Sequence, residues 1–282
     1  MTGVQTCALP ISTILLVPWM AQKWGWQSTF LATGSIGFIW VGLWLWLYKQ
    51  PEVHPKVSVE ELALIRSDPP DKTESVPWRR VFPKKETWAF AMGKFLTDPI
   101  WWFFLFWLPK YLQDTYHLSL MDIRLPTLIV YNASTIGSVY GGWLSGSLIN
   151  RGWSINSARK TAMLICALCV VPVLYAPFAG NMWVVVGILS LAMAAHQGWS
   201  ANLFTTSSDM FPRAAVGSVV GIAGAAGAAG NALMLKFAGW IVTVKGETGG
   251  YFILFMISGS AYLVALGIIH LLSPRLEQAK LD

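Results

Sequence analysis

Long apolar segments make up most of this 282-residue chain. Seven of them hold the roughly 20 mostly apolar residues that a helix needs to cross a bilayer. Only 12% of the residues are charged, whereas a soluble domain carries about 25%. We therefore predict an all-α integral membrane protein. The seven predicted spans are residues 28–47, 87–110, 124–148, 159–178, 182–204, 215–241 and 250–272.

The segment at residues 88–112 is apolar and aromatic, yet it carries Lys94 and Asp98. Because the two are four residues apart, they share one face of a helix. Asp98 lies on the order of 15 Å from Trp88, near the middle of a membrane. A charge at that depth costs roughly 2.5–3.5 kcal/mol, so it needs a partner or a water-filled cavity. We interpret the pair as functional; the alternative is an ion pair that only joins helices. Pro99 follows Asp98 and favours a kink there.

Basic residues are distributed unevenly among the loops. Residues 48–86 form a long polar segment with eight Lys/Arg and six prolines, which we interpret as a cytoplasmic loop between two helical bundles. With that loop in the cytoplasm, 14 Lys/Arg lie on the cytoplasmic side and four on the other. An excess of Lys/Arg marks the cytoplasmic side, so we predict that the tail at residues 274–282 is cytoplasmic. The net charge of +6 follows from this orientation and does not indicate a nucleic-acid-binding protein.

The first residues differ from the rest of the chain. Residues 1–11, MTGVQTCALPI, resemble the translation of a sequencing-library adapter and lack the basic start of a signal peptide. We expect this segment to be an artefact and the natural protein to begin upstream of it. Residues 12–47 would then hold the end of one membrane helix and a complete second one.

Small residues recur at helical spacing in two of the predicted spans. Gly137 and Gly141 lie four apart, and Gly217 and Gly221 form a G-x-x-x-G. Small residues let helix backbones approach closely, and ordinary helix packing is one explanation. However, each of these spans is the second in a group of three whose first span carries polar groups. A three-plus-three repeat with polar sites in mid-membrane is typical of secondary transporters. We therefore assign these glycines to helix packing or gating.

Four segments, taken in order, resemble the major facilitator superfamily, and more narrowly its anion:cation symporter branch. That branch includes hexuronate, galactonate and glucarate transporters. The resemblance covers nearly everything after the first dozen residues. The segments are KFLTDPIWWFFLFWLPKYL at 94–112, GGWLSGSLINRGWSINSARK at 141–160, HQGWSANLFTTSSDMFP at 196–212 and GSVVGIAGAAGAAGN at 217–231.

The resemblance implies a twelve-helix protein with two six-helix bundles. Residues 12–47 would then be the end of helix 5 and helix 6, residues 48–86 the central loop, and residues 87–273 the C-terminal six-helix bundle. The N-terminal bundle of the same protein, missing from this chain, would supply much of the site.

The implied function is proton-coupled symport of a small organic anion, such as a hexuronate or another sugar acid, across the bacterial inner (cytoplasmic) membrane. The expected partners are that anion, a proton and the lipid bilayer. One alternative is transport of a different carboxylate, aromatic or dicarboxylic. Another is a non-functional fragment or scaffold.

Polar residues inside the spans are the candidates for substrate binding, because a sugar acid offers hydroxyl groups and carboxylates. His196 and Ser200 share one helix face, Gln197 lies beside them, and Trp199 offers a ring and an N–H. Asp98, the only carboxylate in any predicted span, is the candidate for proton coupling. The remaining substrate-binding candidates are Tyr131, Asn132 and Lys94.

The loop after residue 148 matches part of the superfamily's basic cytoplasmic signature. That signature usually carries an acidic residue near its middle, where this chain has Ser145 and Gly146. This departure puts in doubt the charge relay that the signature makes with neighbouring helices, and solvated cytoplasmic charge is the equal alternative. The matching residues are Gly142, Arg151, Gly152, Arg159 and Lys160.

Motifs of other function classes are absent from the sequence. It contains no H-E-x-x-H, no G-x-S-x-G and no P-loop, so we expect neither an intramembrane enzyme nor an ATPase. Cys166 and Cys169 form a C-x-x-C, but inside an apolar run, where they read as two small apolar residues. We expect no metal site and no cofactor.

Overall fold

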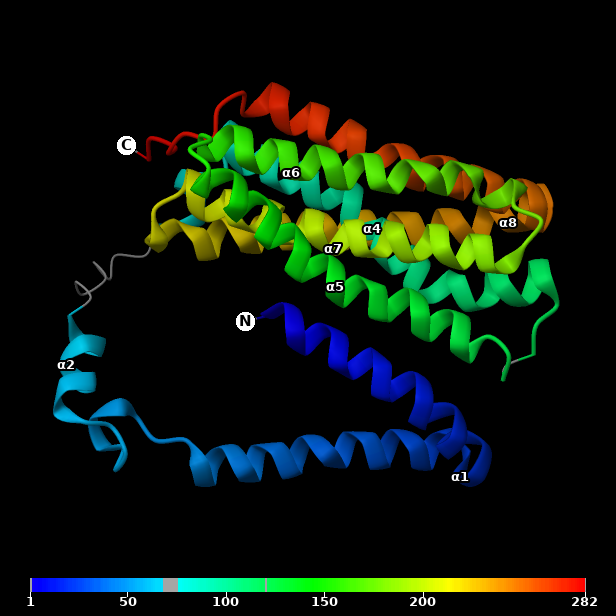
Figure 1. The fold of residues 1–282 in the computed structure, drawn as a ribbon, viewed down its shortest axis with the longest axis horizontal. Helices are drawn as coiled ribbons and strands as arrows, with labels where there is room; N and C mark the ends of the chain where they lie inside the picture. Colours follow the sequence, from blue (N-terminus) through cyan, green and yellow to red (C-terminus); the bar gives the residue numbers. More distant parts are fainter. Residues whose placement is uncertain (1, 68–75, 120, 282) are drawn as a thin grey trace. The chain divides into compact units, whose positions relative to one another are not determined.

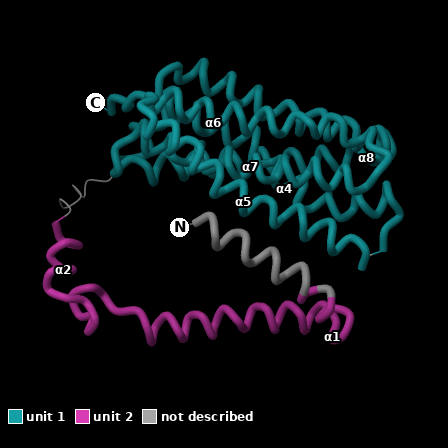
Figure 2. The backbone as a smooth tube through the Cα atoms, in the orientation of Figure 1, with its two compact units in different colours: residues 1–11, 75–282 teal, residues 12–74 magenta. Residues whose placement is uncertain are grey.

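The structure is a computed structural model that describes residues 2–67, 76–119 and 121–281, with side chains described from Leu16 onward except for Pro18. Its described residues form helices and connecting segments, without strands. The chain divides into two compact units, residues 12–74 and residues 75–282 together with residues 1–11 (Figure 2). The all-helical prediction is therefore confirmed.

The smaller unit contains most of α1 (Thr2–Leu47), a short 3₁₀ turn (Pro51–Val53) and α2 (Val59–Arg66). Gly25 interrupts α1 with φ 78°, a left-handed conformation that glycine adopts without steric cost. This break lies in the turn that the sequence places between two membrane helices. Ser58 caps α2, because its hydroxyl accepts a hydrogen bond of 3.1 Å from the backbone N–H of Glu61.

The larger unit is a bundle of long helices that run side by side (Figure 1). The short α3 (Trp78–Val81) leads into α4. Helix α8 doubles back at Gly246, whose φ is 71°, so it forms two antiparallel helices. The long elements are α4 (Lys85–Tyr116), α5 (Arg124–Asn150), α6 (Ile155–Val170) with its 3₁₀ continuation (Val171–Phe178), α7 (Met182–Met210) and α8 (Arg213–Leu272).

These helices lie where the sequence predicts spans, with a few differences in detail. Helix α4 continues to Tyr116, six residues past the predicted end, and it passes through both Pro99 and Pro109 without an interruption. The span that begins with α6 tightens to 3₁₀ geometry over Val171–Phe178, where Pro172 and Pro177 cannot donate backbone hydrogen bonds.

Four helices of the described chain are long and apolar enough to cross a membrane: Trp19–Leu47, Ile155–Phe178, Met182–Met210 and Arg213–Leu272. Helices α4 and α5, with 32 and 27 residues, also exceed the roughly 20 residues that a span needs.

Glycines bring α5 against α7. A Cβ on Gly137 would lie 1.9 Å from the carbonyl oxygen of Ala194, and a Cβ on Gly141 would lie 2.2 Å from the Cα of Gly198. At these distances any side chain would force the two backbones apart. Gly137 and Gly141, which the sequence analysis assigns to packing or gating, therefore lie where the backbones of α5 and α7 meet.

The glycines that bring α8 against α4 are not the predicted ones. A Cβ on Gly217 or Gly221 would meet nothing within 4 Å, so neither packs against another described part of the chain. A Cβ on Gly230 would instead lie 2.4 Å from the carbonyl oxygen of Phe95. Pro99 has no N–H to donate to the Phe95 carbonyl, so α4 lacks one helical hydrogen bond there. Helix α8 approaches α4 at this point.

Candidate functional site

A cavity of about 680 Å³ lies among α4, α5 and α7 of the larger unit. Helix α4 contributes Lys94 and Asp98 to its lining, and α5 contributes Ser138. Helix α7 contributes several polar side chains, including Gln197 and Ser200. A volume of this size lies within the range of small-molecule sites. The structure therefore brings together, around one cavity, polar groups from helices far apart in sequence.

Lys94 and Asp98 form an ion pair on the cavity wall, with 2.6 Å between Nζ and Oδ2. Lys94 is 7% exposed, and its ammonium lies 4.4 Å from the centre of the Phe204 ring, a cation–π contact. On the other side, a Cβ on Gly227 of α8 would lie 2.7 Å from Asp98 Oδ2. Gly227 therefore leaves the space that the carboxylate occupies.

His196 lines the cavity but is held by neighbouring helices. Its Nδ1 lies 2.6 Å from the hydroxyl oxygen of Tyr262 on α8, a hydrogen bond. Its ring stacks on Trp101 of α4, with centroids 5.1 Å apart and planes 21° from parallel. Only 6% of the residue is exposed. His196 therefore links α4, α7 and α8, and little of its surface is open to the cavity.

Gln197 and Ser200 line the cavity as the sequence predicts, whereas three other candidates do not. Trp199 is fully buried and packs edge-to-face on Tyr262. The Tyr131 hydroxyl donates a hydrogen bond of 2.9 Å to the backbone carbonyl of Leu105, and the Asn132 amide donates one of 2.8 Å to its own helix. These contacts give Tyr131 and Asn132 roles in joining or stabilising helices.

The cavity also includes residues that the sequence reasoning missed: Trp101, Trp102, Ser138 and Thr205. Trp101 follows Lys94 by seven residues, which is two helical turns, so helical periodicity could have found it. Thr205 extends the polar face of α7 further, about one and a half turns beyond Ser200. Ser138 comes from another helix, and only the fold reveals that it belongs here.

The match to a family of proteins covers most of the chain. The family model described as Major Facilitator Superfamily matches residues 3–235. The chain belongs to the major facilitator superfamily. The match begins within the segment that resembles an adapter, whose origin stays a prediction.

Among curated proteins of the superfamily, this chain is similar to two from Escherichia coli strain K12. It is 28% identical to "Probable galactarate/D-glucarate transporter GarP" over 242 residues, covering 81% of this chain and 54% of that protein. It is 26% identical to "Hexuronate transporter" over 239 residues, covering 82% of this chain and 55% of that protein. The chain thus spans about half the length of these relatives, which are transporters and not enzymes.

A solved structure shows the same superfamily fold. A bacterial homologue of the human lysosomal transporter Spinster, in an inward-facing and unoccupied conformation, matches with a TM-score of 0.60 at 16% identity. The match covers 97% of this chain and 65% of that one. At this identity the likeness supports the fold alone, and it agrees with the predicted all-α membrane bundle.

One arginine of the superfamily's basic signature pairs with a carboxylate that lies outside the signature. Arg159 on α6 pairs with Asp209 on α7, with 3.2 Å between Nε and Oδ2. The same guanidinium donates a hydrogen bond of 2.9 Å to the Ser145 hydroxyl on α5. A charged link across three helices therefore exists, and the carboxylate missing from the signature comes from α7.

Metal ligands do not gather in the part of the chain that the structure describes. Over those residues, no group of three or more His, Cys, Asp or Glu side chains is placed to hold a metal ion. Cys166 and Cys169 are free thiols on α6. The predictions that the protein uses no metal and no cofactor stay predictions.

Proposed function

We propose that the complete protein is a secondary active transporter that carries a small organic anion, such as a hexuronate or another sugar acid, together with a proton. One observation carries this proposal: a cation, a carboxylate and several neutral hydrogen-bonding groups line a single cavity inside a membrane bundle. Ionisable groups at such depth are typical of substrate or proton pathways. The sugar-acid names of the two relatives support the substrate class.

Lys94 is the group that binds the substrate carboxylate in this proposal. Its ammonium is compensated by Asp98 in the structure, at 2.6 Å. A substrate carboxylate that approaches Lys94 competes with Asp98 for the same cation. Asp98 then loses its ion-pair partner in a poorly hydrated site. Because an unpaired carboxylate is costly there, Asp98 becomes the group that accepts a proton. Binding of the anion and binding of the proton would thereby favour each other, which is the requirement for symport.

Neutral groups on α7 would bind the sugar hydroxyls. Gln197, Ser200 and Thr205 present an amide and two hydroxyls along one wall of the cavity. Burying hydroxyl groups is costly unless each finds a partner, so the wall favours a polyhydroxylated ligand. The Trp101 ring provides a flat apolar surface for the carbon face of a sugar.

The proposal places the complete protein in the bacterial inner membrane, with a cytoplasmic C-terminus and the loop at residues 48–86 on the same side. In it, residues 12–47 belong to the N-terminal bundle and residues 87–273 form the C-terminal one. The missing part of the N-terminal bundle would complete the wall of the site.

A second candidate substrate is an aromatic or dicarboxylic acid. Trp101, Trp102 and Phe204 all line the cavity, and aromatic side chains stack on aromatic ligands. A dicarboxylate would require a second cation, and within the described lining Lys94 is the one cationic side chain. The second cation would then have to come from the missing bundle.

The test is uptake into proteoliposomes by the complete gene product. Labelled galacturonate, galactonate and glucarate are offered separately at pH 6 and pH 8, with an aromatic acid in parallel. We expect saturable uptake of at least one sugar acid, faster with an inward proton gradient. Uptake that does not depend on pH would refute proton coupling, and uptake of the aromatic acid alone would favour the second candidate.

A further inference from the structure

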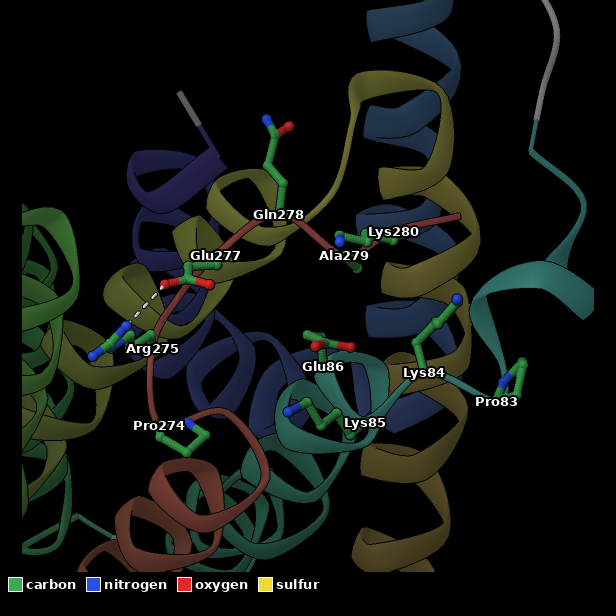
Figure 3. A pocket seen from close by; sticks show the side chains of 10 residues that line it. All are labelled: Pro83, Lys84, Lys85, Glu86, Pro274, Arg275, Glu277, Gln278, Ala279 and Lys280. Atoms are coloured by element: carbon green, nitrogen blue, oxygen red, sulfur yellow. Dashed lines mark ion pairs between the residues drawn. The ribbon is translucent and has the colours of Figure 1, made fainter. Parts of the chain in front are cut away.

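A second cavity, of about 710 Å³, lies where the start of α4 meets the tail that follows α8 (Figure 3). Four cationic side chains line it, two from each segment, together with two carboxylates. The cations are Lys84 and Lys85 on the α4 side and Arg275 and Lys280 on the tail; the carboxylates are Glu86 and Glu277.

Hydrogen bonds hold the tail in place against the bundle. The backbone N–H of Leu276 donates to Asn156 Oδ1 at 3.2 Å, and the backbone N–H of Ala279 donates to the Met210 carbonyl at 2.8 Å. Lys160 Nζ donates to two tail carbonyl oxygens, at 2.7 Å each. The backbone of the tail is therefore held beside the start of α4, and the cationic side chains of both segments line the same cavity.

The carboxylates only partly compensate this positive charge. Arg275 and Glu277 form an ion pair at 3.8 Å, but their side chains are 81% and 74% exposed, so the pair is weak. With four cationic and two anionic side chains, the lining carries a net charge of +2. A fixed concave surface with excess positive charge is suited to an anion, and a phosphate accepts hydrogen bonds from several cations at once.

Exposed aromatic rings next to the cavity indicate which source of phosphate it meets. Trp78, Phe82 and Trp88 are 57%, 43% and 37% exposed, and the Phe82 ring contacts both tryptophan rings edge-to-face. The Arg79 guanidinium lies 5.7 Å from the Trp78 ring. Aromatic and basic residues at the end of a membrane helix are typical of the interface with lipid headgroups. The distribution of Lys/Arg predicts that this end is cytoplasmic.

We propose that this cavity binds the phosphate headgroup of an anionic phospholipid in the cytoplasmic leaflet. Lys84 and Lys85 contact the phosphate from α4, and Arg275 and Lys280 contact it from the tail. The bound phosphate then connects the two pairs of cations. It thereby stabilises the docked tail and the start of α4 as one surface.

Native mass spectrometry of the purified full chain tests this proposal with two lipids, phosphatidylglycerol and zwitterionic phosphatidylethanolamine. We expect phosphatidylglycerol to bind more tightly. The double variant K84Q/K85Q should bind it about 30-fold more weakly, the effect of two cations at an anionic membrane surface. R275Q/K280Q should give a similar loss. Lys85, Arg275 and Lys280 are exposed and Lys84 is half-buried, and thermal unfolding without lipid shows whether each variant remains folded.

The matched control is K236Q/K245Q, which removes two positive charges near Gly246, where α8 reverses its direction. It should bind phosphatidylglycerol as the parent chain does. Equal binding by K84Q/K85Q and the parent would overturn the proposal. Inorganic phosphate at 10 mM is the third arm: if it displaced the lipid and stabilised the chain equally, the site would be one for free phosphate. Each result concerns lipid binding and leaves the transport proposal untouched.

Discussion

Removing one or both charges of the Lys94–Asp98 pair separates a transport role from a purely structural one. Taking one partner from a buried ion pair destabilises a protein by about 3–5 kcal/mol, because a charge stays buried without compensation. Removing both with neutral side chains of similar size is often close to neutral. The Lys94 side chain is 9% exposed and the Asp98 side chain 21%, so both lie in the range where this reasoning applies.

The two single variants should lose different amounts of unfolding free energy. Asp98→Asn leaves the more deeply buried ammonium alone, so we expect a loss of about 3 kcal/mol in the free energy of unfolding. Lys94→Gln leaves a carboxylate that the cavity can hydrate, so the loss should be smaller, about 2 kcal/mol. The double variant K94Q/D98N should return to within about 1 kcal/mol of the parent. Thermal unfolding of the complete gene product in detergent measures these differences.

Transport by the double variant then decides between the two roles. If Lys94 binds the substrate carboxylate and Asp98 carries the proton, K94Q/D98N should be stable but should lose sugar-acid uptake at every pH. A stable double variant that transports at the parental rate would show that the pair only joins helices. That result would refute the proposed coupling between anion and proton.

Three further predictions use the same protein and assays. Gly141→Ala places a Cβ 2.2 Å from the backbone of α7, so it should lower the free energy of unfolding by about 3 kcal/mol, measured by thermal unfolding. Gly142→Ala places its Cβ in open space on α5, so it should raise the free energy of unfolding by about 0.5–1 kcal/mol through helix propensity. Ser200→Ala should raise the KM for a transported sugar acid about five- to tenfold, the effect of one lost hydrogen bond, without changing the unfolding temperature; an unchanged KM would remove this residue from the site. Arg159→Met leaves the Asp209 carboxylate unpaired and should cost about 1–2 kcal/mol of unfolding free energy, which Asp209→Asn in the same chain should largely restore; additive losses would show that the two do not interact.

Local spacing along one helix was enough to predict part of the site. Lys94 and Asp98 lie four residues apart on α4 and form the ion pair that this spacing predicts. On α7, Gln197 and Ser200 fall on one side of a helical wheel at about 100° per residue. Trp199 falls roughly 130° from the centre of that side, so the same periodicity could have placed it in the core.

Contacts between helices could not be predicted in the same way. The glycine-rich run in the first half of α8 offers many equivalent positions, and nothing local distinguishes Gly217 from Gly230. The contact that matters is made where Pro99 leaves the Phe95 carbonyl without a helical partner, which is a property of α4. Likewise, the carboxylate that pairs with Arg159 lies 50 residues further along the chain.

The measurement that tests the account most directly is chemical labelling of a cysteine on the cavity wall. Ser200→Cys and Thr206→Cys are placed separately in the complete gene product, with Cys166, Cys169 and any other cysteine of that protein replaced by alanine. Ser200 lines the cavity, whereas Thr206 is 2% exposed on another face of α7. We predict that a small water-soluble thiol reagent labels the cysteine at 200 but not the one at 206, and that a transported sugar acid protects it. Equal labelling at both positions, or labelling that substrate does not slow, would contradict a solute pathway through this cavity.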